Sequence, residues 1–378
     1  LLEVARSANV AIDAPCSGNG ACGKCRVQLK SGELESKKTL HISDEEYQAG
    51  WRLSCCSKIS ADVNVLVPDI ASAYKSRMKV ADLSSKEEIA IFENAKSDIQ
   101  LAGIELKNSL EVVDVLMDVP SLDDTMPDNE RLTRALRKYL NINRVRIPYV
   151  VLKKLPDVLR ENNFAVKCVI RATSDDMYVY DIFGKDEDVV IGGLAIDIGT
   201  TTVSAVLINM ENGEILAKSS AGNGQIRFGA DVINRIVESQ KPGGQKKLQD
   251  AVIKETINPM IHEMCKSAKF PKDHIYRMCV ASNTTMNHLF AGINADPLRT
   301  EPYIPAFFKT NSLFASDVGV DINKDAHIIM APNIGSYVGG DITAGTLVSM
   351  IWNRPEFSLF IDLGTTVSYT HLTLPTIA

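Results

Sequence analysis

Four cysteines near the N-terminus constrain the fold of this chain more than any other feature. They follow the spacing C-x5-C-x2-C-x29-C and are Cys16, Cys22, Cys25 and Cys55. Five of the eight cysteines lie within the first 56 residues, a clustering typical of a metal site rather than of a disulfide framework. Three thiolates in one loop and a fourth far along the chain indicate a 2Fe–2S cluster of the plant type.

The loop that carries the first three cysteines is rich in glycine. Gly18, Gly20 and Gly23 let a backbone wrap closely round a cluster and turn its N–H groups toward the sulfur atoms. The first gap is one residue longer than the plant-type C-x4-C, which a flexible loop can absorb. Cys56 competes with Cys55 for the fourth position, because adjacent residues do not normally both reach one iron. A structural zinc site is the alternative, although such sites usually repeat a C-x2-C pair.

Two segments give the cysteines a family resemblance. Residues 13–27 resemble the ferredoxin domain of the ATP-dependent reductive activators of corrinoid proteins, and residues 51–55 resemble that family's fourth-ligand segment. The resemblance implies a β-grasp, ferredoxin-like fold and favours Cys55 over Cys56 as the ligand. The family's domain begins with a β-hairpin that this sequence lacks.

A second motif appears twice in the C-terminal half. Residues 194–208 and residues 359–365 each place Asp-x-Gly-Thr at the end of an apolar strand. Such a turn offers N–H groups and hydroxyls to phosphate, and its carboxylate suits a hydrated Mg²⁺. The pair resembles the phosphate motifs shared by acetate and sugar kinases, chaperone ATPases and actin. The residues this assigns to ATP phosphates are Asp197, Gly199, Thr200, Thr201, Thr202, Asp362, Gly364 and Thr365, with Asp197 and Asp362 at Mg²⁺.

Further segments resemble the same families. Residues 332–345 resemble the connecting segment of the kinase and actin superfamily. Residues 223–233, residues 282–289, and residues 119–124 leading to Arg131 and Leu132 resemble the corrinoid activators. The resemblance runs from the first residues to about Thr365, where the following residues become unrelated.

Composition limits the class of partner. A net charge of -6 and a pI near 5.6 argue against nucleic acid, and no apolar run approaches the ~20 residues of a membrane helix. We therefore expect a cytoplasmic protein. The basic residues of 131–138 have helical spacing and predict a solvated helix face, with docking of an acidic partner as the alternative. His262, His274 and His288 are interpreted as surface or core histidines, and Cys168, Cys265 and Cys279 as buried small hydrophobes.

The predicted fold class is multidomain α+β and α/β. We expect a 2Fe–2S ferredoxin-type domain over 1–70, a helical linker over 71–103, a middle α/β domain over 104–188, and the first part of an actin-like, ribonuclease H-like ATPase domain over 189–366. Both ends look cut. Residues 367–378 are expected to be a non-native tail.

The resemblance implies a function for the two motifs together. ATP would drive states in which a partner corrinoid protein of a methyltransferase system is bound and released, while electrons from a low-potential donor pass through the cluster and reduce cobalt(II) to cobalt(I). A homodimer is compatible with this function. One alternative is a ferredoxin-type carrier with a nucleotide-sensing domain. The other is a small-molecule kinase, for which Asp341 is the one candidate catalytic base.

Overall fold

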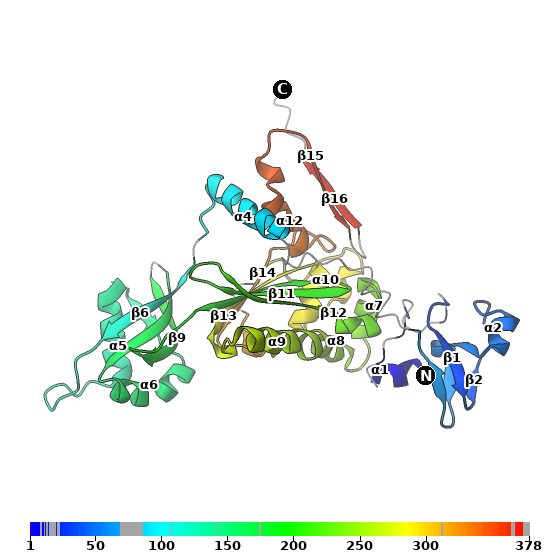
Figure 1. Ribbon diagram of the computed structural model, residues 1–378, viewed down its shortest axis with the longest axis horizontal. Helices are drawn as coiled ribbons and strands as arrows, with labels where there is room; N and C mark the ends of the chain where they lie inside the picture. Colours follow the sequence, from blue (N-terminus) through cyan, green and yellow to red (C-terminus); the bar gives the residue numbers. More distant parts are fainter. Residues whose placement is uncertain are drawn as a thin grey trace.

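The computed structural model describes residues 1–7, 10, 12, 14, 20, 23–68, 86–106, 108–140, 142–173, 175–310, 313–363 and 367–372. The strands in these ranges form five sheets. Figure 1 shows a blue N-terminal part, a cyan-to-green part at the opposite end, a green and yellow centre, and an orange and red upper part. This multidomain α+β and α/β arrangement confirms the predicted fold class. The domain bounds stay predictions.

The N-terminal part consists of short elements around a small core. They are α1 (Leu2–Ser7), β1 (Arg26–Ser31), β2 (Leu34–Ser36), α2 (Asp44–Gln48), β3 (Trp51–Leu53), the 3₁₀ helix η1 (Ser54–Cys56), β4 (Ser57–Ile59) and β5 (Asn64–Leu66). Strand β1 pairs antiparallel with both β3 and β5. Val27 of β1 and Leu53 of β3 are buried in the small hydrophobic core of this part. The apolar spacing of the first eight residues predicts a helix, and the alternation of residues 26–30 and 62–67 predicts two strands. All three are confirmed, although β5 is shorter than its pattern.

A four-stranded sheet covered by two helices forms the part at the other end of the molecule. Its elements are β6 (Leu110–Leu116), α5 (Asp128–Leu140), β7 (Arg144–Arg146), α6 (Tyr149–Glu161), β8 (Ala165–Ala172) and β9 (Asp176–Gly184). The strand order is β6-β8-β9-β7. Helices α5 and α6 face the sheet with Leu132, Leu136, Leu155 and Leu159, a spacing that places all four on the buried side. The sequence pattern predicts helices over residues 129–139 and 155–161, and both are confirmed, although α6 begins earlier, at Tyr149.

Arg131 contradicts the prediction of a solvated basic face on α5. Its side chain is 1% exposed, because its guanidinium closes the loop before the helix. Nη1 donates to Asp124 Oδ2 at 2.7 Å and to the carbonyl of Asp118 at 3.0 Å. Arg134 also donates to Asp124 Oδ2, at 3.2 Å. Helical spacing could not reveal this role, because the partners lie outside the helix.

A five-stranded sheet forms the centre. Its strands are β10 (Gly192–Ile198), β11 (Thr202–Asn209), β12 (Ile215–Gly222), β13 (Ile275–Ser282) and β14 (His327–Met330), in the order β12-β11-β10-β13-β14. Strands β10 to β12 form an antiparallel meander, whereas β13 and β14 run parallel to β10. The accompanying helices are α7 (Val232–Ser239), α8 (Gly244–Val252), a π-helical turn (Ile253–Ile257), α9 (Asn258–Ala268), α10 (Thr284–Ala291), α11 (Ala315–Val318) and α12 (Gly340–Ser349).

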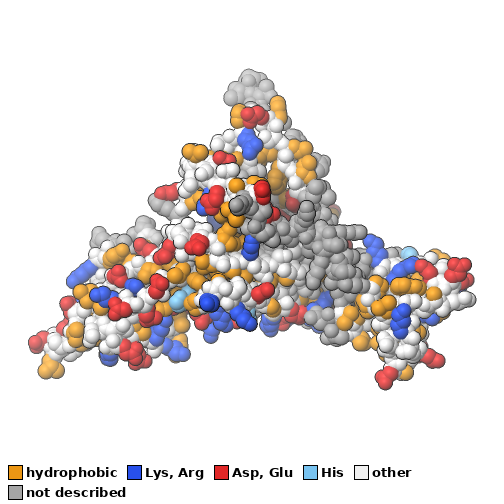
Figure 2. All heavy atoms as spheres, in the orientation of Figure 1, with side chains coloured by type: hydrophobic (Ala, Val, Ile, Leu, Met, Phe, Trp, Pro, Cys, Tyr) orange, Lys and Arg blue, Asp and Glu red, His pale blue; other side chains and the backbone are white. Residues whose placement is uncertain are grey.

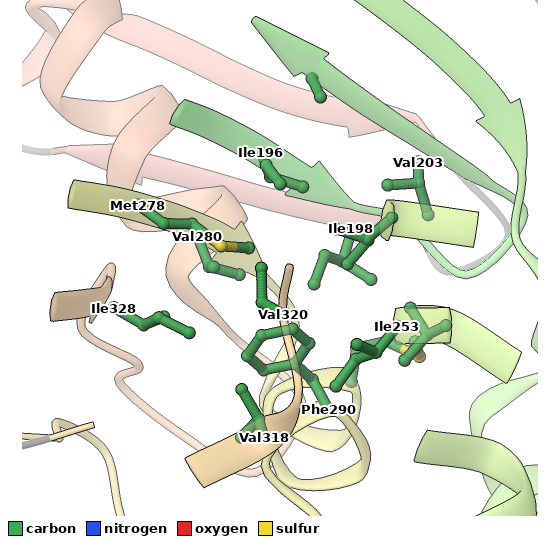
Figure 3. Packing of buried hydrophobic residues seen from close by; sticks show 14 of the residues in the cluster. Ile196, Ile198, Val203, Ile253, Met278, Val280, Phe290, Val318, Val320 and Ile328 are labelled. Atoms are coloured by element: carbon green, nitrogen blue, oxygen red, sulfur yellow. The ribbon is translucent and has the colours of Figure 1, made fainter. Parts of the chain in front are cut away.

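The two faces of this sheet differ. Strand β10 places Leu194, Ile196 and Ile198 in the main core. Figure 3 shows how Ile196 and Ile198 pack there with Val203 and Phe290. The intervening residue Asp197 therefore points to the opposite face, because side chains alternate along a strand. In Figure 1 helices α8 and α9 lie below the sheet, and α12 lies above it. Helix α12 also contacts β13, so Asp197 points to the side on which α12 packs.

The upper part brings together α12, a helix from a distant region of the chain and a hairpin that follows α12. Helix α4 (Lys86–Leu101) packs against α12, and β15 (Ser358–Leu363) pairs antiparallel with β16 (Val367–Leu372). Helix α4 confirms the predicted helical character of that region, although residues 69–85 lie outside the described residues. Figure 2 shows hydrophobic side chains on the surface of the upper part, and Phe357 and Leu359 are 84% and 62% exposed. Apolar side chains gathered in this way are typical of a contact surface.

No described helix combines the length and the apolar character needed to cross a lipid bilayer.

Candidate functional site

Strand pairing brings two of the predicted cluster ligands together. Cys25 immediately precedes β1, and Cys55 lies in η1, immediately after β3. The antiparallel register places Arg26 opposite Leu53, and the N–H of Ser54 donates to the carbonyl of Cys25 at 2.8 Å. The sheet therefore fixes the distance between a loop cysteine and the distant fourth cysteine.

The sulfur positions suit two ligands of one metal ion. The Sγ atoms of Cys25 and Cys55 lie 3.2 Å apart. Thiolates bound at about 2.3 Å to one tetrahedral metal lie about 3.8 Å apart, so a small opening of the pair would admit an iron. The Sγ of Cys56 lies 3.6 Å from that of Cys55, and the structure brings Cys55 rather than Cys56 next to Cys25. This supports the choice of Cys55, which stays a prediction. Cys16 and Cys22 lie outside the described residues.

Hydrogen bonding polarises the cysteine pair. The contact between the two sulfur atoms lowers the pKa of Cys25 and raises the pKa of Cys55. Because a metal binds the thiolate form, a metal held by this pair would displace its protons.

Two glycines shape the loop beside these sulfurs. Gly20 and Gly23 have φ values of +74° and +67°, a left-handed conformation that glycine adopts without strain. A Cβ on Gly23 would also lie 2.6 Å from the side chain of His41. Backbone conformation therefore favours glycine at both described positions of the predicted glycine-rich loop; Gly18 lies outside the described residues.

The first Asp-x-Gly-Thr motif forms the tight turn between β10 and β11. The N–H of Gly199 donates to the carbonyl of Thr202 at 2.9 Å, and a Cβ on Gly199 would meet that carbonyl oxygen at 2.8 Å. Thr200 is buried, whereas Thr201 and Thr202 are partly exposed. Ile198 and Val203, on either side of the turn, anchor it in the core (Figure 3).

Two asparagines hold the turn against its neighbours. Asn223 Nδ2 donates to the carbonyl of Gly199 at 2.8 Å. Asn283 caps α10 by accepting from the N–H of Met286, and its Nδ2 lies 3.5 Å from Thr200 Oγ1. These contacts bring residues 223–233 and 282–289, which resemble the corrinoid activators, to the turn at residues 199–202, the predicted phosphate turn.

The connecting segment approaches from the other side. Asn333 Oδ1 accepts from Asn287 Nδ2 at 3.0 Å and from the N–H of Gly340 at 2.9 Å. A Cβ on Gly339 would lie 2.3 Å from the Cα of Asn283, so only glycine permits this approach. The result is that α12 begins beside the turn, with Asp341 in its first turn.

Three carboxylates from three elements influence one another here. Burial raises the pKa of Asp197 to about 6, with further contributions from the charges of Asp341 and Asp362. Burial, and then the charge of Asp362, also raises the pKa of Asp341. The side chain of Asp197 nevertheless remains accessible to solvent, so a ligand can reach it.

These carboxylates fit a hydrated cation better than a bare one. In the ranges that the structure describes, no three histidine, cysteine, aspartate or glutamate side chains lie close enough to ligate one metal ion directly. Mg²⁺ usually keeps several water molecules and takes only one or two carboxylates. Asp197 and Asp362 suit that arrangement. Gly364 and Thr365 of the second motif lie outside the described residues.

Arg235 is a residue of this region that the motifs did not reveal. It lies on α7, is fully buried, and donates to the carbonyl of Thr200. A signal for it existed in the sequence: Val232, Arg235 and Ile236 occupy one helical face, which places a charge on an apolar stripe.

The remaining candidates have structural partners. His288 is buried, with Nδ1 on the carbonyl of Thr284 at 2.8 Å and Nε2 accepting from the N–H of Ala306 at 3.0 Å. His262 is exposed and pairs with Asp321. Cys168 is buried as predicted, but Cys279 is exposed, because its position in β13 points to the face opposite the core.

Family comparisons match three consecutive regions of the chain. The RACo middle region matches residues 192–354, the RACo linker region matches residues 99–189, and the 2Fe–2S iron–sulfur cluster binding domain matches residues 1–60. The N-terminal part is thus a 2Fe–2S cluster binding domain.

Individual proteins are similar either to nearly the whole chain or to a short part of it. The corrinoid activation enzyme RamQ of Eubacterium limosum is 27% identical over 365 residues, which are 96% of this chain and 54% of the relative. One component of the Na⁺-translocating NADH-quinone reductase of Actinobacillus succinogenes is 38% identical over 71 residues, 18% of this chain and 17% of the relative.

A solved structure extends the similarity to the fold. The reductive activator for corrinoid, iron–sulfur protein is 32% identical, with a TM-score of 0.63, and the match covers 98% of this chain and 58% of that structure. The chain therefore spans little more than half the length of the two relatives that match along its whole extent.

Proposed function

This chain belongs to the family of reductive activators of corrinoid proteins, and we propose that it serves an ATP-dependent reduction of cobalt(II) to cobalt(I) in a partner corrinoid protein. The single observation that carries the proposal is the presence of two sites on one chain. One is the converging Cys25–Cys55 pair, and the other is the carboxylate-lined turn at Asp197.

The cysteine pair supports the electron-carrying step. Cys16, Cys22, Cys25 and Cys55 would hold the cluster. A bound 2Fe–2S cluster supplies one-electron transfer, near about -400 mV in plant-type proteins. Cys25 is fully buried and Cys55 is partly exposed, so the protein would shield one side of the cluster and leave the other close to the surface. Electrons from a low-potential donor would enter and leave on that side.

The carboxylate-lined turn supports the ATP step. The N–H groups and hydroxyls of residues 199–202 would receive the phosphates, and Asp197 with Asp362 would hold the hydrated Mg²⁺. A divalent cation would favour the charged form of Asp197 and Asp341, whose pKa values are raised by burial and further by neighbouring carboxylates. Binding would therefore draw together β10, α12 and β15, the three elements that carry these carboxylates.

Packing offers a way to couple the two steps. The first turn of α12 contains Asp341, and α12 packs against α4, which lies between the cluster domain and the four-stranded sheet in the sequence. A shift of α12 on nucleotide binding would move α4. Nucleotide can change the affinity for a partner only by binding two states of the protein unequally. A movement of α12 against α4 would distinguish two such states.

ATP dependence is the decisive test. In a full-length activator with these residues, a low-potential donor and ATP should convert the cobalt(II) form of a cognate corrinoid protein to cobalt(I), seen as a change in corrinoid absorption. Equal reduction without ATP would indicate a ferredoxin-type carrier with a nucleotide-sensing domain. Phosphorylation of a small molecule by cluster-free protein would indicate a kinase with Asp341 as base. The methyltransferase system, the homodimer and the cytoplasmic location stay predictions.

A further inference from the structure

Arg235 is a buried positive charge that has no carboxylate partner among the described residues. Its exposed fraction is 0%, and no acidic side chain in the described ranges lies within ion-pair distance of its guanidinium. Two acids lie near it in sequence. Glu238 forms an ion pair with Lys241 at 2.6 Å, and Asp231 is occupied at the N-terminus of α7, where it accepts from the N–H of Asn234 at 2.8 Å and from Asn234 Nδ2 at 2.7 Å.

Every acceptor of Arg235 is neutral. Nε donates to the carbonyl of Gly229 at 2.9 Å, and Nη1 lies 3.2 Å from both Gln225 Oε1 and Met286 Sδ. Nη2 donates to the carbonyl of Thr200. The guanidinium thus joins the segment after β12, helix α10 and the phosphate turn.

An unpaired charge in this position is costly. A buried cation without a counter-ion loses its hydration, and neutral hydrogen-bond partners recover only part of that loss. Burial lowers the pKa of Arg235 to about 9, which still leaves the guanidinium protonated at neutral pH. An anion that arrives only with a ligand would explain why an arginine occupies the site.

The phosphate turn supplies the place for that anion. The carbonyl of Thr200 accepts a hydrogen bond from Arg235, so this carbonyl points into the protein. Arg235 therefore contacts the buried side of the turn. We propose that Arg235 is a positioning residue and the fixed counter-charge for the phosphate chain bound at residues 199–202. This inference rests on the proposed nucleotide site.

Inorganic polyphosphates test the inference on this chain itself, because they need no adenosine pocket. Binding of orthophosphate, pyrophosphate and tripolyphosphate would be measured by calorimetry with Mg²⁺ present. Wild-type protein should bind tripolyphosphate. Arg235→Met should weaken tripolyphosphate by about tenfold or more, and pyrophosphate and orthophosphate progressively less, because the lost attraction scales with ligand charge. Arg160→Met is the matched control: it removes an arginine of the linker region that pairs with Asp128, and should bind as wild type does.

Two results would overturn the inference in different ways. If wild-type protein binds tripolyphosphate and Arg235→Met binds it equally well, the phosphate site stands and the role of Arg235 falls. If folded wild-type protein binds no polyphosphate, the nucleotide site falls as well, and the inference with it. An equal loss for all three ligands would show a structural role only.

Arg235→Lys covers the case in which the methionine variant does not fold. A lysine buried there should have a lowered pKa, because burial disfavours its charged form. Its affinity for tripolyphosphate should therefore fall more steeply between about pH 6 and pH 8 than that of the wild type, in which arginine keeps its proton over that range. Parallel pH profiles for the two proteins would contradict an electrostatic role.

Discussion

The Sγ atoms of Cys25 and Cys55 lie 3.2 Å apart, although the two residues are separated by 30 positions in the sequence. The pairing of β1 with β3 produces this approach, because it sets the ends of both strands side by side. The sheet therefore places two of the predicted cluster ligands next to each other. The Sγ of Cys56 lies 3.6 Å from that of Cys55.

The cysteine geometry predicts the iron content. Anaerobically purified protein should be red-brown and contain about two irons and two sulfides per chain, as a plant-type centre requires. Iron and sulfide assays together with the visible spectrum would check this. Stoichiometric zinc without visible absorption would refute the cluster.

The neighbouring cysteines provide a matched pair of variants. Cys55→Ser should lose or strongly perturb the cluster, because it removes the sulfur that faces Cys25. Cys56→Ser should leave the absorption spectrum nearly unchanged. The opposite result would identify Cys56 as the fourth ligand.

The position of Asp197 predicts how its substitution affects ATP hydrolysis. In a full-length activator with these residues, Asp197→Ala should abolish Mg²⁺-dependent ATP hydrolysis and leave the cluster spectrum intact, because the two sites lie in different parts of the chain. A phosphate-release assay over a range of Mg²⁺ concentrations would measure it. Asp273→Ala, at an exposed position before β13, is the control and should hydrolyse ATP normally. Turnover with an unchanged Mg²⁺ dependence in Asp197→Ala would remove that residue from the site.

Asp197 also predicts a dependence of stability on pH. Its folded-state pKa of about 6 lies above the usual aspartate value of 3.8, so the folded protein binds more protons than the unfolded chain between these values. The free energy of unfolding therefore falls as pH rises from about 4 to 6. Asp197→Asn should remove this part of the fall and stabilise the ligand-free protein at pH 7, by about 1 kcal/mol once solvent screening is considered. Urea unfolding of wild type and variant at pH 4 and pH 7 would test it. If the two proteins differ in free energy of unfolding by the same amount at both pH values, the prediction is contradicted.

The sequence predicts those parts of the sites that are local in the chain. The Asp-x-Gly-Thr turn lies between two apolar strands, so its position and its hairpin follow from nearby residues alone. Cysteine spacing likewise predicts the ligand loop, because clusters need thiolates at set intervals. The α/β alternation after residue 189 predicts the central sheet.

Residues whose partners are distant escape this kind of prediction. Arg131 has helical spacing with other basic residues and was assigned to a solvated face, yet its partners Asp118 and Asp124 precede the helix. Asn333 and Arg235 act through the close approach of α7, α10 and α12. That approach depends on side-chain packing and on Gly339, which no periodicity reveals.

Arg131 and Arg134 predict unequal contributions to stability. Arg131→Ala should destabilise the protein by about 3 kcal/mol or more, because it leaves loop carbonyls and the carboxylate of Asp124 without their buried donor. Arg134→Ala should cost less than about 1 kcal/mol, since its ion pair with Asp124 is partly exposed. Chemical denaturation of both variants would measure the difference, and equal costs would show that the loop does not depend on Arg131.

The last prediction separates electron entry from ATP use. In a full-length activator with these residues, Cys25→Ser should block reduction of the corrinoid partner but spare ATP hydrolysis, because the turn at residues 199–202 does not involve the cysteines. Asp197→Ala should do the opposite: it should accept an electron from the donor, seen as bleaching of the cluster, yet fail to produce cobalt(I). A simple carrier needs only its cluster, so in a carrier the aspartate variant would reduce the partner normally. A kinase would keep its activity in the cysteine variant and show no need for a corrinoid partner. The crossed pattern is thus expected only if nucleotide binding and electron transfer act on the same partner through separate sites.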